Sequence, residues 1–211
     1  YVVLGAAILW FGWFGFNAGS QLAADGIASS AFLVTNTAAA TAALTWGVVS
    51  QIKNGKMGAV GVATGAVAGL VAITPAAGFV GIYGALAIGL GAGVLCFFAV
   101  DLINSTGLDD ALDVFAVHGI GGIWGAIATG IFAVEAIGGT AGLIEGNWEQ
   151  VLIQFYAVAA TLVYSGIVTL VILKILDLIP GLGLRASESD ENIGLDISQH
   201  GEQASVDDGA D

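Results

Sequence analysis

The residues from Asp113 to Val134 constrain this chain more than any other stretch. They form an apolar run in which His118 is the only ionisable side chain after Asp113. Written as an α-helix, a run of about 22 residues can cross a hydrocarbon layer of roughly 30 Å. His118 would then lie inside a membrane, where an ionisable side chain is costly unless it meets a partner or lines a polar path. We therefore favour a functional histidine over one that is merely satisfied in a core.

The composition supports a membrane setting for the whole chain. Of the 211 residues, 57% are hydrophobic and only 10% are charged, whereas about a quarter of the residues in a soluble domain carry charge. The 33 glycines occur with only two prolines, which indicates close helix packing rather than flexible linkers. A single cysteine, Cys96, excludes an intramolecular disulfide and a cysteine-based metal site. We predict an all-α polytopic membrane bundle that is not an enzyme, with no cofactor, no metal and no nucleic-acid partner.

Polar turns divide the chain into six apolar runs, which we predict to be transmembrane helices. Their approximate ranges are 1–16, 27–49, 59–73, 78–100, 113–134 and 148–178. The first run is short for a complete crossing and begins with Tyr1, so we expect the chain to start inside a helix. Residues 1–178 are the predicted transmembrane domain, and residues 179–211 are an acidic tail that we expect to be flexible on its own.

The few basic residues predict the topology. Lys53 and Lys56 follow the second run, and Lys174 and Arg185 flank the end of the sixth. Because successive crossings alternate sides, both places fall on the same side, and cationic residues accumulate on the cytoplasmic side of a membrane. The tail is therefore predicted to be cytoplasmic, in a multi-pass protein of the inner or plasma membrane.

An aromatic cluster closes the first run and allows two interpretations. Trp10, Trp13, Phe14 and Phe16 lie close to Ser20. Aromatic rings near an interface often serve as membrane anchors. Alternatively, the ring faces could attract a small cation by about 0.5 to 2 kcal/mol, with the Ser20 hydroxyl as an acceptor. Composition alone does not separate the two interpretations.

Asp113 stands where the fifth run begins. A carboxylate at a helix N-terminus is favourable by about 0.3 to 1 kcal/mol, so we predict that Asp113 is the N-cap. The alternative interpretation places Asp113 and Asp110 in an inner vestibule, where a cation would leave.

Small and hydroxyl-bearing residues in the apolar runs are interpreted as packing elements. Gly61, Gly65 and Gly69 recur every four residues and predict a close-packing face. We expect the same packing role, or hydrogen bonding between helices in the case of the threonines, for Gly119, Gly122, Gly125, Thr64, Thr74 and Thr129.

Four motifs resemble the ammonium transporter family. They are Gly12-Trp-Phe-Gly-Phe-Asn-Ala-Gly-Ser20, Ala68-Gly-Leu-Val-Ala-Ile-Thr-Pro75, Asp113-Val-Phe-Ala-Val-His-Gly119, and Gly194-Leu-Asp196 with His200-Gly-Glu202. The family fold has eleven transmembrane helices and forms homotrimers with a narrow pore through each subunit. The resemblance implies that this chain corresponds to the C-terminal six helices and tail.

The resemblance also implies roles for individual residues. Phe16 matches one of two phenylalanines that close the outer pore mouth, and Ser20 matches the hydroxyl position of the outer ammonium recruitment site, with Trp13 as its aromatic neighbour. His118 matches one of a pair of pore histidines. The resemblance places the second histidine, the second phenylalanine and a recruiting tryptophan in the N-terminal half of the family fold.

The tail resembles the family segment that meets a trimeric nitrogen-signalling regulator of the PII type. The matching residues are Gly194, Leu195, Asp196, His200, Gly201 and Glu202. The aromatic residue expected shortly afterwards is replaced by Ala204-Ser-Val.

The predicted function is ammonium uptake across a membrane. Ammonium would be recruited at the outer aromatic site, and ammonia would pass His118 with a proton relay. One alternative is an ammonium sensor that signals through its tail, although a short tail favours transport. Another is a channel for a different small neutral solute, which would leave the aromatic residues outside and the imidazole within unexplained.

Overall fold

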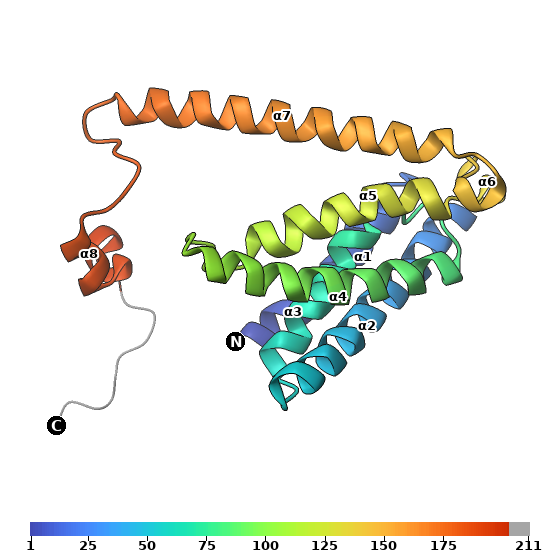
Figure 1. Ribbon diagram of the computed structural model, residues 1–211, viewed down its shortest axis with the longest axis horizontal. Coiled ribbons are helices and arrows are strands. Elements are labelled where there is room, and N and C mark those ends of the chain that lie inside the picture. Colours follow the sequence, from blue (N-terminus) through green and yellow to red (C-terminus); the bar gives the residue numbers. More distant parts are fainter. Residues whose placement is uncertain (203–211) are drawn as a thin grey trace. The chain divides into compact units, whose positions relative to one another are not determined.

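The computed structural model describes residues 1–202 and divides the chain into two compact units, Tyr1–Ala159 and Ala160–Asp211 (Figure 1). We describe the two units separately. The Ala204-Ser-Val segment and the rest of the tail's end, residues 203–211, lie outside the described residues.

The described residues are helical apart from turns and one isolated bridge between Val80 and Ala133, which confirms the predicted all-α class. In chain order the elements are α1 (Val2–Gly19), α2 (Gly26–Asn54), α3 (Ala59–Ile73), α4 (Ile82–Thr106), the π-helix η1 (Phe115–Gly119), α5 (Ile120–Phe132), α6 (Glu135–Gly138), the 3₁₀-helix η2 (Leu143–Glu145), α7 (Glu149–Asp177), α8 (Glu188–Ile193) and the π-helix η3 (Asp196–His200). Helix α7 begins in the first unit and continues into the second.

Several helices differ in extent from the predicted runs. Helix α2 starts at the Asp25 cap, whose carboxylate accepts hydrogen bonds from the N–H groups of Ile27 and Ala28 at 3.0 Å. It continues through polar residues to Gly55, where a φ of 72° ends the helix in the left-handed region that glycine tolerates. Helix α4 likewise extends to Thr106, past the predicted end at residue 100. In both helices the backbone hydrogen bonds continue through polar residues. The apolar run therefore predicts the membrane-embedded part of the helix but not where the helix ends.

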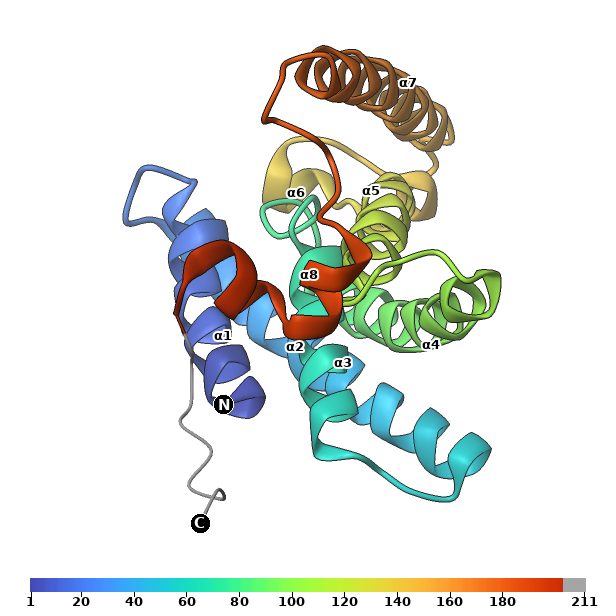
Figure 2. The ribbon, with the colours of Figure 1, turned by 90° about the vertical axis from the view of Figure 1, so that its left-hand side faces the viewer.

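Helix α2 is the centre of the first unit and packs against α1, α3 and α4 (Figures 1 and 2). Its buried face is rich in alanine, including Ala38 and Ala42, both fully buried. A Cβ added to Gly69 of α3 or to Gly89 of α4 would lie 2.5 Å from the Ala38 carbonyl oxygen. Because no side chain intervenes at these positions, the backbones of both neighbouring helices approach α2 closely.

The predicted glycine face of α3 is used in this packing. A Cβ on Gly61 would lie 3.0 Å from the Trp46 indole nitrogen, and one on Gly65 would lie 2.5 Å from the Trp46 Cβ. Trp46 is only 5% exposed and contacts the Phe97 ring of α4 edge-on, with ring centroids 5.4 Å apart. One large side chain thus fills the space that the two glycines leave open.

Beyond Trp46, an ion pair joins the end of α2 to α4. The Lys53 ammonium pairs with the Asp101 carboxylate. The same ammonium lies 5.5 Å and 5.2 Å from the ring centroids of Phe97 and Phe98. These contacts keep the polar ends of the two helices together, although both charged groups are partly exposed, so the gain in stability is small.

Helix α5 packs on α3 and α4 through two further close approaches. Gly125 lies so near Ala72 that an added Cβ would overlap its carbonyl oxygen. The Trp124 indole N–H donates to the Ile88 carbonyl oxygen at 2.9 Å, and its ring covers Gly91. Gly125 is therefore a packing surface as predicted, whereas no heavy atom of the described residues lies within 4 Å of a Cβ added to Gly122.

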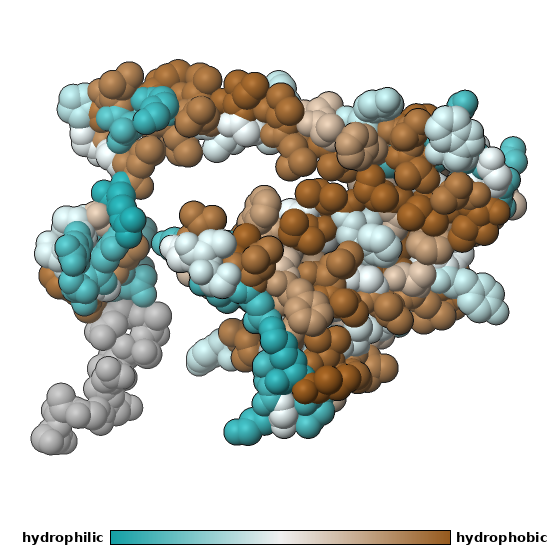
Figure 3. Space-filling view, viewed as in Figure 1, coloured by the Kyte–Doolittle hydropathy of each residue, from teal (hydrophilic) through white to brown (hydrophobic). Residues whose placement is uncertain are grey.

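The outer surface of the helices is apolar. The side of the first unit that faces the viewer in Figure 3 is mostly hydrophobic, and α7 has no buried residue along its whole length. Within the described part of the chain, five helices are long and apolar enough to cross a membrane, and α3 is a shorter apolar helix. Such a surface would be unstable in water and is stable in lipid, so this is a multi-pass membrane protein.

Replacing Gly125 with alanine is expected to destabilise the protein. The added methyl group would overlap the Ala72 carbonyl, and relieving the overlap costs about 1 to 3 kcal/mol. Gly122→Ala, in the same helix, meets open space and is the control. Thermal unfolding in detergent should show a lower Tm for Gly125→Ala alone. Equal Tm values for the two variants would contradict this packing.

Candidate functional site

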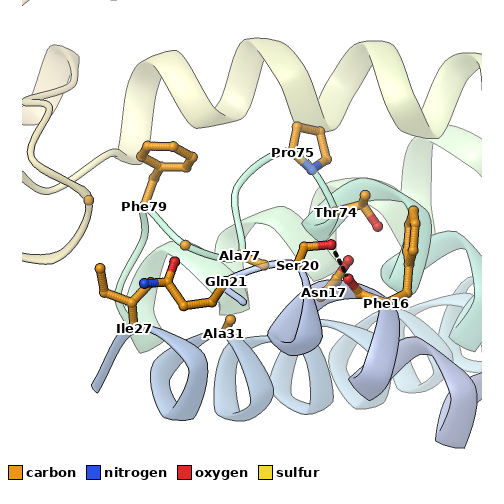
Figure 4. A pocket seen from close by; sticks show the side chains of 12 residues that line it. Phe16, Asn17, Ser20, Gln21, Ile27, Ala31, Thr74, Pro75, Ala77 and Phe79 are labelled. Atoms are coloured by element: carbon orange, nitrogen blue, oxygen red, sulfur yellow. Dashed lines mark hydrogen bonds between the residues drawn. The ribbon is translucent and has the colours of Figure 1, made fainter. Parts of the chain in front are cut away.

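A cavity of about 370 Å³ opens where α1 and α2 meet the connection between α3 and α4 (Figure 4). We call it the Ser20 cavity. The residues that line it are Phe16, Asn17, Ser20, Gln21, Ile27, Ala31, Thr74, Pro75, Ala77, Gly78, Phe79 and Gly138. The structure therefore brings Phe16 and Ser20 together, as the sequence predicted for a recruitment site, but it does not place Trp13 in the lining.

Two hydrogen bonds between helices hold α1 at this cavity. The Trp13 indole N–H donates to the Thr74 hydroxyl at 2.8 Å, and the Thr74 hydroxyl donates to its own helix at Leu70. One turn further along, the Asn17 amide donates to the Thr35 hydroxyl at 3.0 Å. Asn17 is 8% exposed and Thr35 is fully buried. Trp13 therefore positions α1 through its polar edge.

The side chains of Phe16 and Ser20 remain available on the cavity side. Phe16 is 59% exposed and contacts Trp13 edge-on, with ring centroids 5.9 Å apart. The Ser20 hydroxyl donates to the Phe16 carbonyl oxygen at 2.5 Å, which leaves its oxygen lone pairs free to accept (Figure 4). This corner combines an aromatic ring with a hydrogen-bond acceptor, which is the chemistry that attracts a small cation.

Sequence reasoning missed several residues of the Ser20 cavity. Asn17, Gln21 and the segment from Pro75 to Phe79 were assigned no site role, although Pro75 ends one of the four motifs. Of the threonines interpreted as bonding between helices, Thr74 does so, by accepting from Trp13. Thr64 and Thr129 instead donate to the carbonyl oxygens of their own helices, at Val60 and Gly125.

His118 lies apart from this cavity. It belongs to the π-helix η1, directly before α5, and is exposed on the surface of the first unit. About 20 Å separates it from the other end of α5, as estimated from 1.5 Å per residue. At that other end Ala133 pairs with Val80, next to Phe79 of the Ser20 cavity. A π-turn of this kind is rare and is found frequently at functional sites.

Asp110, and not Asp113 as the sequence predicted, supplies the side-chain cap before η1. The Asp110 carboxylate accepts from the N–H groups of Val114 at 2.8 Å and Phe115 at 2.9 Å, so Asp110 caps the helix that carries His118. The prediction of an Asp113 side-chain cap is wrong. Asp113 adopts a φ of 53°. Among the described residues no helix N–H donates to its carboxylate, and only its backbone oxygen accepts, from Val117.

The electrostatics of this pair follow from its geometry. Partial burial raises the pKa of the Asp113 carboxyl, and the nearby negative charge of Asp110 raises that pKa further. A cation near Asp113 would lower this pKa again, because it stabilises the charged carboxylate.

The tail residues singled out by the sequence lie in the second unit, in η3 and the residues on either side of it, just after the short helix α8. The Ser187 hydroxyl caps α8 by accepting from the Asp190 N–H at 3.2 Å. The Glu202 N–H donates to the Asp196 carbonyl oxygen at 3.0 Å. The motif from Gly194 to Glu202 is thus folded on itself, and Leu195 and His200 are exposed.

Fold and site together define a class of protein: a helical multi-pass membrane protein with a small, largely apolar cavity that carries a few polar groups at the end of α1, and a histidine on a separate helix. A scan against protein families matches residues 1–205 to the Ammonium Transporter Family. The chain belongs to this family.

Individual relatives agree with this assignment. Ammonium transporter Amt1 of Archaeoglobus fulgidus is 51% identical over 202 residues, which cover 96% of this chain and 51% of that protein. The ammonium transporter of Bacillus subtilis is 50% identical over 207 residues, which cover 97% of this chain and 51% of its own. This chain therefore spans about half the length of these relatives.

Solved structures share the fold. Mep2 of Saccharomyces cerevisiae superposes with a TM-score of 0.84 at 41% identity, covering 89% of this chain and 43% of its own. A protein described as a sensor Amt protein superposes with a TM-score of 0.84 at 32% identity, covering 93% of this chain and 48% of its own. The likeness confirms that this chain has the fold of part of a larger ammonium-transporter-like protein.

Replacing Thr74 with valine is expected to loosen α1. The variant keeps the shape of the side chain but removes the acceptor for the Trp13 N–H, and an unsatisfied, partly buried donor costs about 1 to 3 kcal/mol. Thr64→Val in the same helix removes a bond within α3 only and is the control. Hydrogen exchange of α1 should accelerate in Thr74→Val alone; unchanged exchange would contradict an anchoring role.

Proposed function

We propose that the protein of which this chain is a part is an ammonium transporter. The observation that carries the proposal is family membership over residues 1–205. The exposed His118 of η1 and the aromatic, hydroxyl-bearing corner at Phe16 and Ser20 support it. The relatives cited above are themselves described as ammonium transporters.

The physical basis of the proposed mechanism is the cost of a cation in an apolar passage. Ammonium is strongly hydrated, and a narrow apolar pore offers it little in exchange for water. At the Ser20 cavity the Phe16 ring and the Ser20 oxygen would hold the cation before it loses a proton. Neutral ammonia would then cross the apolar segment, and the His118 imidazole would hydrogen-bond it and take part in moving the proton.

The exposure of His118 supports the proposal that this chain forms only part of the pore wall. Phe16 and His118 are both exposed, although both match pore residues of the family. We infer that a segment equivalent to the unmatched half of the relatives covers Phe16 and His118 and provides the second histidine. Asp110 would then act indirectly, because its carboxylate holds the first turn of the helix that carries His118. Asp113 is the inner carboxylate that an emerging cation would meet.

The proposed setting follows from the basic residues and the family. The chain would lie in the inner or plasma membrane as part of a homotrimer, among lipids, with residues 179–211 as its acidic cytoplasmic tail. The motif of Gly194, Leu195, Asp196, His200, Gly201 and Glu202 would contact a regulator of the PII type. Exposed apolar side chains around this motif, such as Ile193, Leu195 and Ile197, support a binding role.

An ammonium sensor is the alternative that the sequence left open. A sensor Amt protein shares the fold at 32% identity, below the 50% and 51% of the two ammonium transporters, so the comparisons do not favour this alternative. The fold is common to both functions, so it does not separate them. Measured uptake separates them, because a sensor binds ammonium without net transport.

Replacing His118 with alanine in the full-length protein is expected to abolish most uptake of labelled methylammonium. The experiment uses cells that lack other ammonium uptake, and alanine removes the group that would bond ammonia and relay its proton. Thr64→Val, which removes only a hydrogen bond within α3, is the control and should transport normally. Unchanged uptake by His118→Ala would count against a relay role for this residue.

Deleting residues 193–211 from the full-length protein is expected to abolish binding of a PII-type regulator in a pull-down assay. The deletion removes the exposed motif of the second unit and leaves the membrane helices unchanged. Asp207 and Asp208 lie after the motif. Replacing both with asparagine is the control for the negative charge that the deletion also removes. Equal capture of the intact and the deleted protein would exclude the tail as the binding segment.

A further inference from the structure

A second, smaller cavity of about 80 Å³ lies in the first unit, where α5 ends and α7 begins. We call it the Gln154 chamber. Its polar lining comes from three segments that are distant in the sequence: Thr129 of α5, Thr140 of the loop that follows α6, and Gln150 and Gln154 of α7. None of these residues has a part in the function proposed above.

A glycine brings the two glutamines to this place. A Cβ on Gly130 of α5 would lie 2.9 Å from the Gln150 carbonyl oxygen and 3.1 Å from the Gln154 Cγ. The first turns of α7 therefore lie directly on the backbone of α5. Both glutamine side chains are partly buried as a result, although most of α7 is exposed.

Several polar groups of the chamber have hydrogen-bonding capacity that the described residues leave unused. Within residues 1–202, the side-chain amides of Gln150 and Gln154 have no hydrogen-bond partner in the protein. Each amide offers two N–H donors and a carbonyl oxygen with two lone pairs. The Thr129 hydroxyl donates to the Gly125 carbonyl oxygen at 2.8 Å and keeps its own lone pairs. These donors and acceptors can hydrogen-bond a small polar molecule that enters the chamber.

The size and charge of the chamber limit what can meet this need. A water molecule occupies about 30 Å³ in the liquid, so the chamber has room for about two or three molecules of that size. No ionisable side chain lines it, which disfavours an ion. Neutral, water-sized molecules that both donate and accept hydrogen bonds fit the lining.

The chamber adjoins the Ser20 cavity without being part of it. Pro75 and Phe79 line both cavities, so these two side chains form the wall between them. The Phe79 ring packs directly on Gly138, because a Cβ added to Gly138 would lie only 2.3 Å from the Cδ1 atom of Phe79.

We propose that the Gln154 chamber is a binding site for two or three neutral, water-sized molecules, either water or ammonia, held by Gln150, Gln154 and Thr129. These molecules complete the hydrogen bonds that join the start of α7 to α5. The site does not depend on the transport function, so it stands or falls by its own test.

The test is a crystal structure of the full-length protein, grown without ammonium, at a resolution that shows ordered solvent. The expected result is solvent density within hydrogen-bonding distance of the Gln150 and Gln154 amides. Gln154→Leu should lose at least one of these peaks, and Ile153→Leu, an exposed neighbour outside the chamber, should keep them all. The proposal is overturned if the wild-type chamber shows no density, or if the two amides bond to protein groups instead.

A second crystal soaked in methylammonium distinguishes the two ligands. Peaks that stay round support water as the bound molecule, whereas a peak elongated by the methyl group supports entry of the neutral amine as well. Should Gln154→Leu fail to fold, the wild-type density decides alone.

Discussion

The close approach of helix backbones around α2 is the constraint on which the rest of the first unit depends. Between lipid-embedded helices the hydrophobic effect contributes little, since lipid tails are as apolar as the side chains they would replace. Association then depends on dispersion forces and hydrogen bonds, and dispersion requires contact at van der Waals distance. Gly69 and Gly89 meet the same carbonyl group of Ala38, so α3 and α4 are both located against one point of α2. That contact also places the connection between α3 and α4, which forms one wall of the Ser20 cavity.

Within this apolar bundle a few hydroxyl groups carry much of the polar organisation. Thr35 and Thr74 each donate to a carbonyl oxygen of their own helix, at 2.6 Å and 2.8 Å, and so satisfy their protons locally. The oxygen lone pairs of both hydroxyls remain free to accept. The Asn17 amide of α1 donates to Thr35, and the Trp13 indole of α1 donates to Thr74. The position of α1, and with it the placement of Phe16 and Ser20, therefore depends on two donors that find acceptors on different helices.

His118 is an ionisable side chain on the exposed surface of an otherwise apolar helical run. It is presented by a π-turn that the Asp110 carboxylate caps, and it faces away from the packed interior of the first unit. This chain spans about half the length of its relatives. The proposed pore wall, contributed jointly by two halves, would account for the exposure of His118 and of the Phe16 ring in this chain.

The amino-acid sequence alone determined the class of the protein, because length and apolarity suffice to predict helices that cross a membrane. It also singled out His118, Phe16 and Ser20, since an imidazole in an apolar run is costly and the motifs are specific. Only the tertiary structure decided that Asp110 and not Asp113 caps the helix of His118, that Trp13 anchors α1, and that Gln150 and Gln154 line a chamber. Trp13 and Thr74 are 61 residues apart. Hydrophobic periodicity shows which residues face a core, but hydrogen-bond partners and cavities depend on how distant segments meet in space.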